Sequence, residues 1–100
     1  MNINTLGLCK KAGKLIIGFD AVCAEMSNPA TKAAGIILAA DLSEKTKKEL
    51  AYQLQKTNSK LKTVQIYATM DEIAEVLGKR TGIIAITDEG FFKAVTSHMK

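Results

Sequence analysis

Hydrophobic residues in this 100-residue chain follow two spacings, which alternate from its first residues to its last. Apolar residues at every third or fourth position indicate a helix with one buried face, whereas short continuous or alternating apolar runs indicate strands. Helical spacing is found in five groups of residues: Ile3, Leu6 and Cys9; Phe19, Val22, Cys23 and Met26; Leu42, Thr46, Leu50 and Leu54; Met70, Ile73, Ala74 and Leu77; and Phe91, Phe92, Val95 and Met99. Strand patterns are found at residues 15–17, 36–40, 64–68 and 83–86.

Residues that favour helix ends stand at the borders of the helical groups. Gly13 ends the first predicted helix, Pro29 stops the second, and the third begins near Ser43. Thr69 and Glu72 form a capping-box pattern at the start of the fourth. This regular alternation of helix and strand predicts the α/β class, as a three-layer α/β/α sandwich whose central four-stranded mixed sheet is covered on both faces.

The composition is that of a folded domain. Hydrophobic residues make up 47% of the chain and charged residues 24%, with one proline and no run of glycine or serine. We therefore expect a single domain over residues 1–100, without linkers or disordered tails. The chain contains neither a secretory signal segment nor an apolar run of roughly 18 residues, the length that a membrane-spanning helix needs. We expect a cytoplasmic protein that makes no membrane contact and remains a monomer.

The charged residues are unevenly distributed. The chain has fourteen Lys and Arg residues and ten Asp and Glu residues, which give a formal net charge of +4. Residues 1–19 and 50–70 each carry three lysines and no acid, whereas the acids gather at predicted helix starts, where they complement the helix dipole. Segregation of this kind favours a polyanionic partner over a randomly solvated surface.

Side chains that could carry catalytic chemistry are few and scattered. Cys9 and Cys23 form no metal-binding spacing, and the chain has one histidine, His98. Both cysteines fall on apolar helix faces and are interpreted as core residues. Tyr52 and Tyr67 are interpreted as residues at the edge of the core, with stacking on nucleic-acid bases as the alternative. The sequence thus predicts a non-enzymatic protein with no catalytic residue, metal or cofactor.

Two polar residues follow predicted strands, where open α/β sheets place ligand sites. Asp41 follows residues 36–40, and Thr87 follows residues 83–86. A receiver domain, which accepts a phosphoryl group on an aspartate, has residues of this type at these places but also needs paired acids after its first strand. Here the first predicted strand is followed by Gly18, Phe19 and Asp20, without such a pair. We expect Asp41 and Thr87 to cap the helices that follow them.

The first candidate binding segment joins a predicted strand to a predicted helix. Lys14 precedes the strand at residues 15–17, and Gly18 follows it at the start of a helix. Phe19, Asp20 and Ala21 form the first helical turn, where free N–H groups and the positive end of the helix dipole suit a phosphate or a base edge. The alternative is that Gly18 only makes a tight strand-to-helix turn.

The second candidate binding segment leads into the last predicted strand. Lys79 and Arg80 are followed by Thr81 and Gly82, and Ile83 begins the strand. Positive charge and flexible backbone at the end of a rigid element again suit an anionic ligand.

The order of the elements and these two segments resemble the kink-turn RNA-binding ribosomal-protein superfamily of the L-seven-Ae/L-thirty-e type, and most of all its bacterial YlxQ-like branch. The resemblance extends over nearly the whole chain. Its most specific motifs are Ala12-Gly13-Lys14-Leu15, the stretch from Ile36 through Ala39-Ala40-Asp41 to Ser43, Leu77-Gly78-Lys79, and Ile86-Thr87-Asp88-Glu89-Gly90-Phe91.

The resemblance implies that one end of the sandwich docks against a sharply bent RNA. The start of the second helix would read sheared G·A pairs through Gly18, Phe19, Asp20 and Ala21, and the segment from Arg80 through Thr81 and Gly82 to Ile83 would contact a flipped-out nucleotide. In this hypothesis Lys14, Lys79 and Arg80 neutralise phosphates, while Ile83 packs on the unstacked base. The expected partner is structured, kink-turn-like RNA, with ribosomal RNA as a candidate, and the protein would be ribosome-associated.

Two other classes of function remain open at this stage. The first is a protein-interaction adaptor that kept the fold and lost the RNA contacts. The second is the receiver-type signalling domain, which phosphorylation of Asp41 by a small phosphodonor would reveal.

Overall fold

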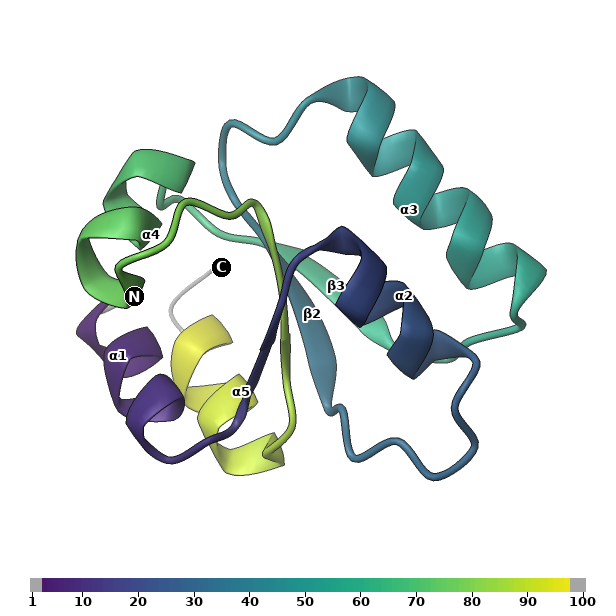
Figure 1. The fold of residues 1–100 in the computed structure, drawn as a ribbon, viewed down its shortest axis with the longest axis horizontal. Helices are drawn as coiled ribbons and strands as arrows, with labels where there is room; N and C mark the ends of the chain where they lie inside the picture. Colours follow the sequence, from purple (N-terminus) through teal and green to yellow (C-terminus); the bar gives the residue numbers. More distant parts are fainter. Residues whose placement is uncertain (1–2, 98–100) are drawn as a thin grey trace.

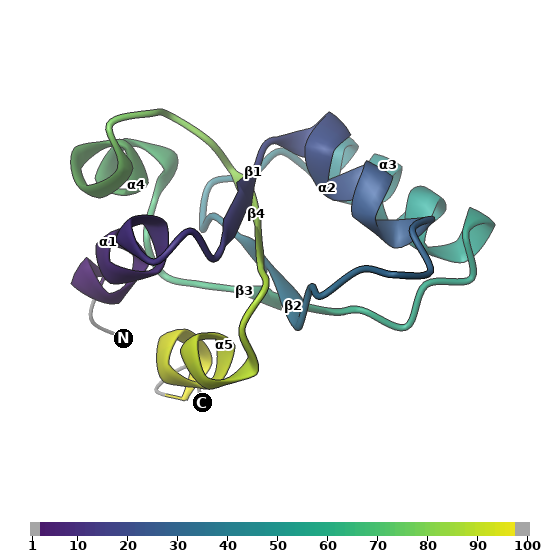
Figure 2. The same ribbon diagram turned by 60° about the horizontal axis from the view of Figure 1, so that its bottom comes forward.

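A central sheet separates two layers of helices in the computed structural model, which describes residues 3–97 (Figure 1). The elements in chain order are α1 (Asn4–Lys11), β1 (Leu15–Ile17), α2 (Phe19–Met26), β2 (Gly35–Leu38), α3 (Glu44–Lys56), β3 (Lys62–Gln65), α4 (Met70–Leu77), β4 (Ile83–Ile86) and α5 (Glu89–Thr96). Helices α1, α4 and α5 cover one face of the sheet, and α2 and α3 cover the other (Figure 2). The predicted three-layer sandwich is confirmed.

The sheet is mixed and has the strand order β1-β4-β2-β3. Strand β4 runs antiparallel to both of its neighbours, whereas β2 and β3 are parallel. In the register, Leu38 lies opposite both Ile83 and Gln65, and Ile17 lies opposite Ile84. The turn at Gly18 follows Ile17, so we name this end of the sheet the Gly18 end. The opposite end, named the Lys62 end, is marked by Leu15, Ile86, Gly35 and Lys62.

Strands β2 and β4 are buried along their whole length. Ile37, Ile84 and Ile86 pack under α1, α4 and α5, whereas Ile36 and Ala85 pack under α2 and α3. Because helices cover both faces, these strands show no polar alternation and read as continuous apolar runs in the sequence. That burial explains why the patterns at residues 36–40 and 83–86 were clear.

Two strands occupy bounds that differ from the prediction. Strand β2 covers Gly35–Leu38 and β3 covers Lys62–Gln65, where residues 36–40 and 64–68 were expected. The apolar pattern marks which residues are buried and not where the ladder ends, and Ala39, Ile66 and Ala68 are all buried just beyond it. Their backbone stays bonded, with Ile66 N donating to Leu38 O at 2.8 Å and Ala40 N to Ala68 O at 2.8 Å.

Helix caps largely follow the sequence signals. Thr69 and Glu72 form the predicted capping box, and Ser43 accepts a hydrogen bond from Thr46 N at the start of α3. Asp88 caps α5, whereas the backbone N–H of Thr87 donates to Lys14 O at 2.8 Å. The expectation that Thr87 caps α5 is therefore wrong, because Asp88 is the N-cap residue and Thr87 is still bonded to Lys14, the residue before β1.

The two cysteines are core residues, as predicted. Cys9, on α1, is fully buried in the core shared by α1, α4 and α5, and Cys23 is partly buried against the cluster beneath α2 and α3. Met99 and His98 lie outside the described residues. Among residues 3–97, no helix combines the length and the apolar character needed to cross a membrane.

Candidate functional site

A backbone hydrogen bond brings the two candidate binding segments together. Gly18 N donates to Ile83 O at 3.0 Å, which joins the start of α2 to the start of β4. Gly18 is the N-cap residue of α2 with φ 104° and ψ 154°, a conformation that L-amino acids rarely adopt. A Cβ there would meet no atom within 4 Å, so glycine is required by backbone conformation and not by space. Gly18 therefore makes a tight turn from β1 into α2.

The first turn of α2 is exposed apart from its first residue. Phe19 packs partly against the cluster beneath α2 and α3, whereas Asp20 and Ala21 are exposed. Gly18 makes no side-chain cap, which leaves first-turn N–H groups for an acceptor outside the helix. The carboxylate of Asp20 lies beside them and complements the helix dipole. This turn therefore offers both donors and an acceptor to a ligand.

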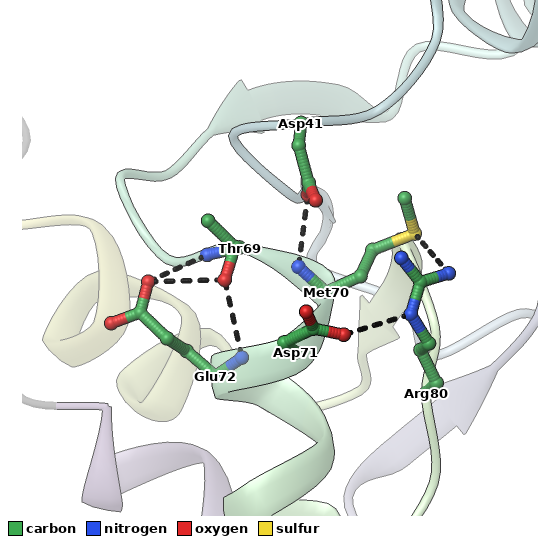
Figure 3. Close-up of polar contacts among 6 residues, drawn as sticks. All are labelled: Asp41, Thr69, Met70, Asp71, Glu72 and Arg80. Carbon is green, nitrogen blue, oxygen red and sulfur yellow. Dashed lines mark hydrogen bonds and ion pairs between the residues drawn. The ribbon is translucent and has the colours of Figure 1, made fainter.

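The loop before β4 presents its basic residues and buries the residue that follows them. Lys79 and Arg80 are exposed, and Arg80 Nε lies 3.0 Å from Asp71 Oδ1 (Figure 3). Thr81 is only 8% exposed, and its hydroxyl donates to Ile83 O at 3.2 Å. The ion pair fixes Arg80 against the first turn of α4, and Thr81 holds the loop from inside.

The predicted contact between Ile83 and a flipped-out base is wrong. Ile83 is 3% exposed and belongs to the core beneath α2 and α3. Its position in the ladder opposite Leu38 turns the side chain toward that core. Gly82 is closely packed as well, since a Cβ there would lie 2.7 Å from Leu42 Cδ1. Gly82 and Ile83 therefore support the loop by packing against the core.

Lys14 lies away from the other predicted site residues. Its carbonyl accepts the hydrogen bond from Thr87 N, which places it at the Lys62 end of β1. Gly18 lies four positions further along this extended chain, about 13 Å away at the usual rise of a strand. The structure thus brings the start of α2 and the loop before β4 together, without Lys14.

Asp41 has a role that the sequence did not reveal. Its Oδ1 accepts a hydrogen bond from Met70 N at 2.9 Å, across 29 positions of sequence (Figure 3). Asp41 therefore ties the loop after β2 to the first turn of α4, and the expectation that it caps α3 is wrong because Ser43 does so. No local signal predicts such a bond, since it depends on the pairing of β2 with β3.

Charges of both signs surround the Gly18 end. Lys79 and Arg80 are balanced in part by exposed acids, namely Asp20, Asp41, Asp71 and Glu72. On α3, Lys47 Nζ lies 3.1 Å from Glu44 Oε1, and its side chain is 26% exposed. Lys45 and Lys48, also on α3, are exposed. The positive charge at this end is therefore local, and it centres on the loop before β4.

Tyr52 and Tyr67 do not lie at the edge of the core. Tyr67 is 73% exposed and Tyr52 is 60% exposed, so this interpretation of the sequence is wrong. The two cysteines are not activated as nucleophiles. Burial raises the pKa of Cys9 and of Cys23, and the nearby Asp20 carboxylate raises the pKa of Cys23 further. A raised pKa lowers the thiolate fraction, which does not suit a nucleophile.

Comparison with known proteins identifies the family. Residues 3–96 match the model of the Ribosomal protein L7Ae/L30e/S12e/Gadd45 family. RNA-binding protein YlxQ of Enterococcus faecium is 34% identical over 93 residues, which cover 91% of this chain and 84% of that protein. The solved structure of a protein with unknown function from Bacillus halodurans has the same fold, with a TM-score of 0.77 at 22% identity over 95% of this chain and 92% of that chain. Because the family match extends over nearly all of the chain, this protein belongs to the Ribosomal protein L7Ae/L30e/S12e/Gadd45 family.

Proposed function

We propose that this protein is a non-enzymatic, ribosome-associated RNA-binding protein that recognises kink-turn-like RNA with the Gly18 end of its sheet. The observation that carries the proposal is the hydrogen bond from Gly18 N to Ile83 O, because it unites the two segments that the family resemblance assigns to RNA. The name of the Enterococcus faecium relative, RNA-binding protein YlxQ, supports the same function.

The chemistry at the Gly18 end suits a bent RNA. Gly18 and Ala21 carry little or no side chain, so the helix start can approach a groove closely. First-turn N–H groups donate to phosphate or base acceptors, and the Asp20 carboxylate accepts from amino groups on base edges. Lys79 and Arg80 pair with phosphates, which position the RNA without reading its sequence. Lys14, about 13 Å away by strand rise, would contact the backbone farther along the RNA.

A protein-interaction adaptor is the second candidate. The observation in its favour is the pairing of Arg80 with Asp71 at 3.0 Å, together with exposed Asp20 beside the helix start. Both features lower the positive charge that RNA would meet. A direct binding experiment separates the two functions, because an adaptor would show no salt-dependent affinity for folded RNA.

The first prediction concerns the salt dependence of RNA binding. If about four to six phosphates are neutralised, a plot of log affinity against log salt should have a slope of roughly −3 to −5. Replacing Arg80 with alanine should weaken binding to all RNAs and reduce the magnitude of this slope by about 1. Lys62→Ala is the matched control, since Lys62 is an exposed cation at the opposite end of the sheet. Filter binding of a kink-turn RNA and of an unbent duplex gives both quantities.

The following results would contradict this proposal. A flat salt dependence, or equal affinity for the kinked and the unbent RNA, would refute kink-turn recognition. If Lys62→Ala changed the slope as much as Arg80→Ala, the RNA would not be bound at the Gly18 end.

The second prediction concerns Asp20, whose negative charge lies beside the proposed phosphate site. Replacing Asp20 with asparagine removes that charge and supplies an amide donor, so kink-turn RNA should bind about 5-fold tighter or more, as expected for one added base-edge contact. The protein should become slightly less stable because the helix dipole loses its acid. Glu49→Gln is the control, since Glu49 is an exposed acid on α3. Equal gains from both variants would indicate a general charge effect and not a contact at Asp20.

A further inference from the structure

The burial of Ile83 leaves the proposed RNA surface without a side chain for an unpaired base. Tyr67 is the aromatic residue that the structure exposes at the same end of the sheet, where 73% of its surface is accessible. The register fixes its place: Leu38 lies opposite both Ile83 and Gln65, and Tyr67 follows Gln65 by two residues. Strands β4 and β3 are separated only by β2, so the lateral distance between them is about 10 Å.

Tyr67 follows β3 at a place where the core beneath α2 and α3 does not reach. Val64, Ile66 and Ala68 pack under α1, α4 and α5, whereas Gln65, the last residue of β3, and Tyr67, two residues beyond it, are exposed. The core beneath α2 and α3 draws on β2 and β4, and it includes no residue of β3 among those that the structure describes. The chain from the end of β3 to Tyr67 is therefore not covered by α2 and α3.

Polar side chains lie beside Tyr67. Ala40, Lys47, Gln65 and Ile66 line a shallow hollow together with Tyr67. Gln65 Nε2 donates to Ala39 O and to Ala40 O, each at 3.2 Å, which fixes its amide against the end of β2. Lys47 supplies a cation at the same hollow, where its single ion-pair partner among the described residues is Glu44. An aromatic ring, a fixed amide and an ammonium group are thus placed together.

We propose that Tyr67 is a stacking platform for an unpaired nucleobase, with Lys47 pairing the phosphate of the same nucleotide. The inference rests on the proposed RNA-binding function and deepens it. Base stacking on an exposed aromatic ring is largely independent of sequence, and its loss weakens binding by roughly 5- to 150-fold. Stacking requires the ring and not its hydroxyl, so phenylalanine should replace Tyr67 in this role.

Affinity measurements test the proposal with a matched control. Tyr67→Ala should weaken binding of a kink-turn RNA with an unpaired nucleotide by roughly 5- to 150-fold, while Tyr67→Phe should remain within about 2-fold of the native chain. Tyr52→Ala is the control, since Tyr52 is also an exposed tyrosine, at 60%, but lies on α3. Melting temperatures should be nearly equal for all three variants because both rings are exposed.

Tyrosine fluorescence tests the contact directly, because the chain has two tyrosines and no tryptophan. In a Tyr52→Phe chain, Tyr67 emits alone, and saturating RNA should quench it strongly. In a Tyr67→Phe chain, the remaining Tyr52 should keep its emission. An RNA in which the unpaired nucleotide is abasic should bind with loss of the quenching.

The outcomes distinguish this inference from the function on which it rests. If the native chain binds kink-turn RNA while Tyr67→Ala binds equally well and Tyr67 is not quenched, the stacking role is refuted and the RNA-binding function stands. If the native chain binds no RNA, the stacking role of Tyr67 and the proposed RNA-binding function are both refuted. Quenching by an unbent duplex to the same extent would also refute the role, because it requires an unpaired base.

Discussion

Replacing Ile83 with serine should lower the free energy of unfolding by about 3–5 kcal/mol, because a buried isoleucine leaves a cavity when truncated and serine adds a hydroxyl group to the core. Ile83 is 3% exposed beneath α2 and α3. In a domain of this size each kcal/mol corresponds to about 4–8 °C in melting temperature, so a fall of roughly 12 °C or more is expected. Thermal unfolding followed by circular dichroism measures it.

A conservative substitution separates packing from any direct RNA contact at Ile83. Ile83→Val removes one methyl group and should lower the free energy of unfolding by only about 0.5–1.5 kcal/mol. RNA affinity, measured well below the melting temperature and corrected for the folded fraction, should stay close to native for both variants. An Ile83→Ser chain with native melting temperature and weakened RNA binding would contradict the buried position.

Local patterns in the sequence were sufficient for the order and type of the elements. The helical spacing of Val22, Cys23 and Met26 and the continuous run at residues 83–86 are set by burial on one face or on both, and each pattern is complete within a few residues. The capping box of Thr69 and Glu72 is local as well. Features of this kind depend on short-range geometry, so sequence analysis recovered them with correct residues.

The candidate site depended on long-range pairing, and the sequence predicted it only in part. In an all-apolar strand, the sequence pattern does not show toward which face of the sheet each side chain points. The direction of the Ile83 side chain could therefore not be predicted. The bonds of Asp41 to Met70 and of Arg80 to Asp71 join residues that only the folded sheet and α4 bring together. Lys14 is close to Gly18 in sequence but lies at the far end of β1.

The exposure of Tyr67 illustrates the same limit. The alternation of Val64, Ile66 and Ala68 predicted one buried face correctly. Whether the opposite face is covered depends on where α3 lies, and α3 is placed by its packing on α2 and on the core of β2 and β4. Tyr67 was therefore assigned to the edge of the core, although the fold exposes it.

Gly35 should tolerate even a single added methyl group poorly, because the ring of Phe92 occupies the space beside it. A Cβ on Gly35 would lie 2.2 Å from Phe92 Cζ and 2.3 Å from Phe92 Cε1. Gly35 is buried at the start of β2, and Phe92 is 7% exposed on α5, so the ring must shift to admit a methyl group. Overpacking of this kind costs about 1–3 kcal/mol, and we expect Gly35→Ala to lower the free energy of unfolding by an amount in that range.

A double-mutant cycle with Phe92→Leu identifies the cause of this loss. Each single variant should be destabilised, Gly35→Ala by steric conflict and Phe92→Leu by a cavity, whereas in the double variant the new methyl group fills part of that cavity. The double variant should therefore be more stable than the sum of the single effects predicts, with a coupling of about 1 kcal/mol or more. Denaturant unfolding of the four proteins measures the coupling. Strictly additive losses would contradict a clash between these two residues and would indicate that alanine disturbs the start of β2 by itself.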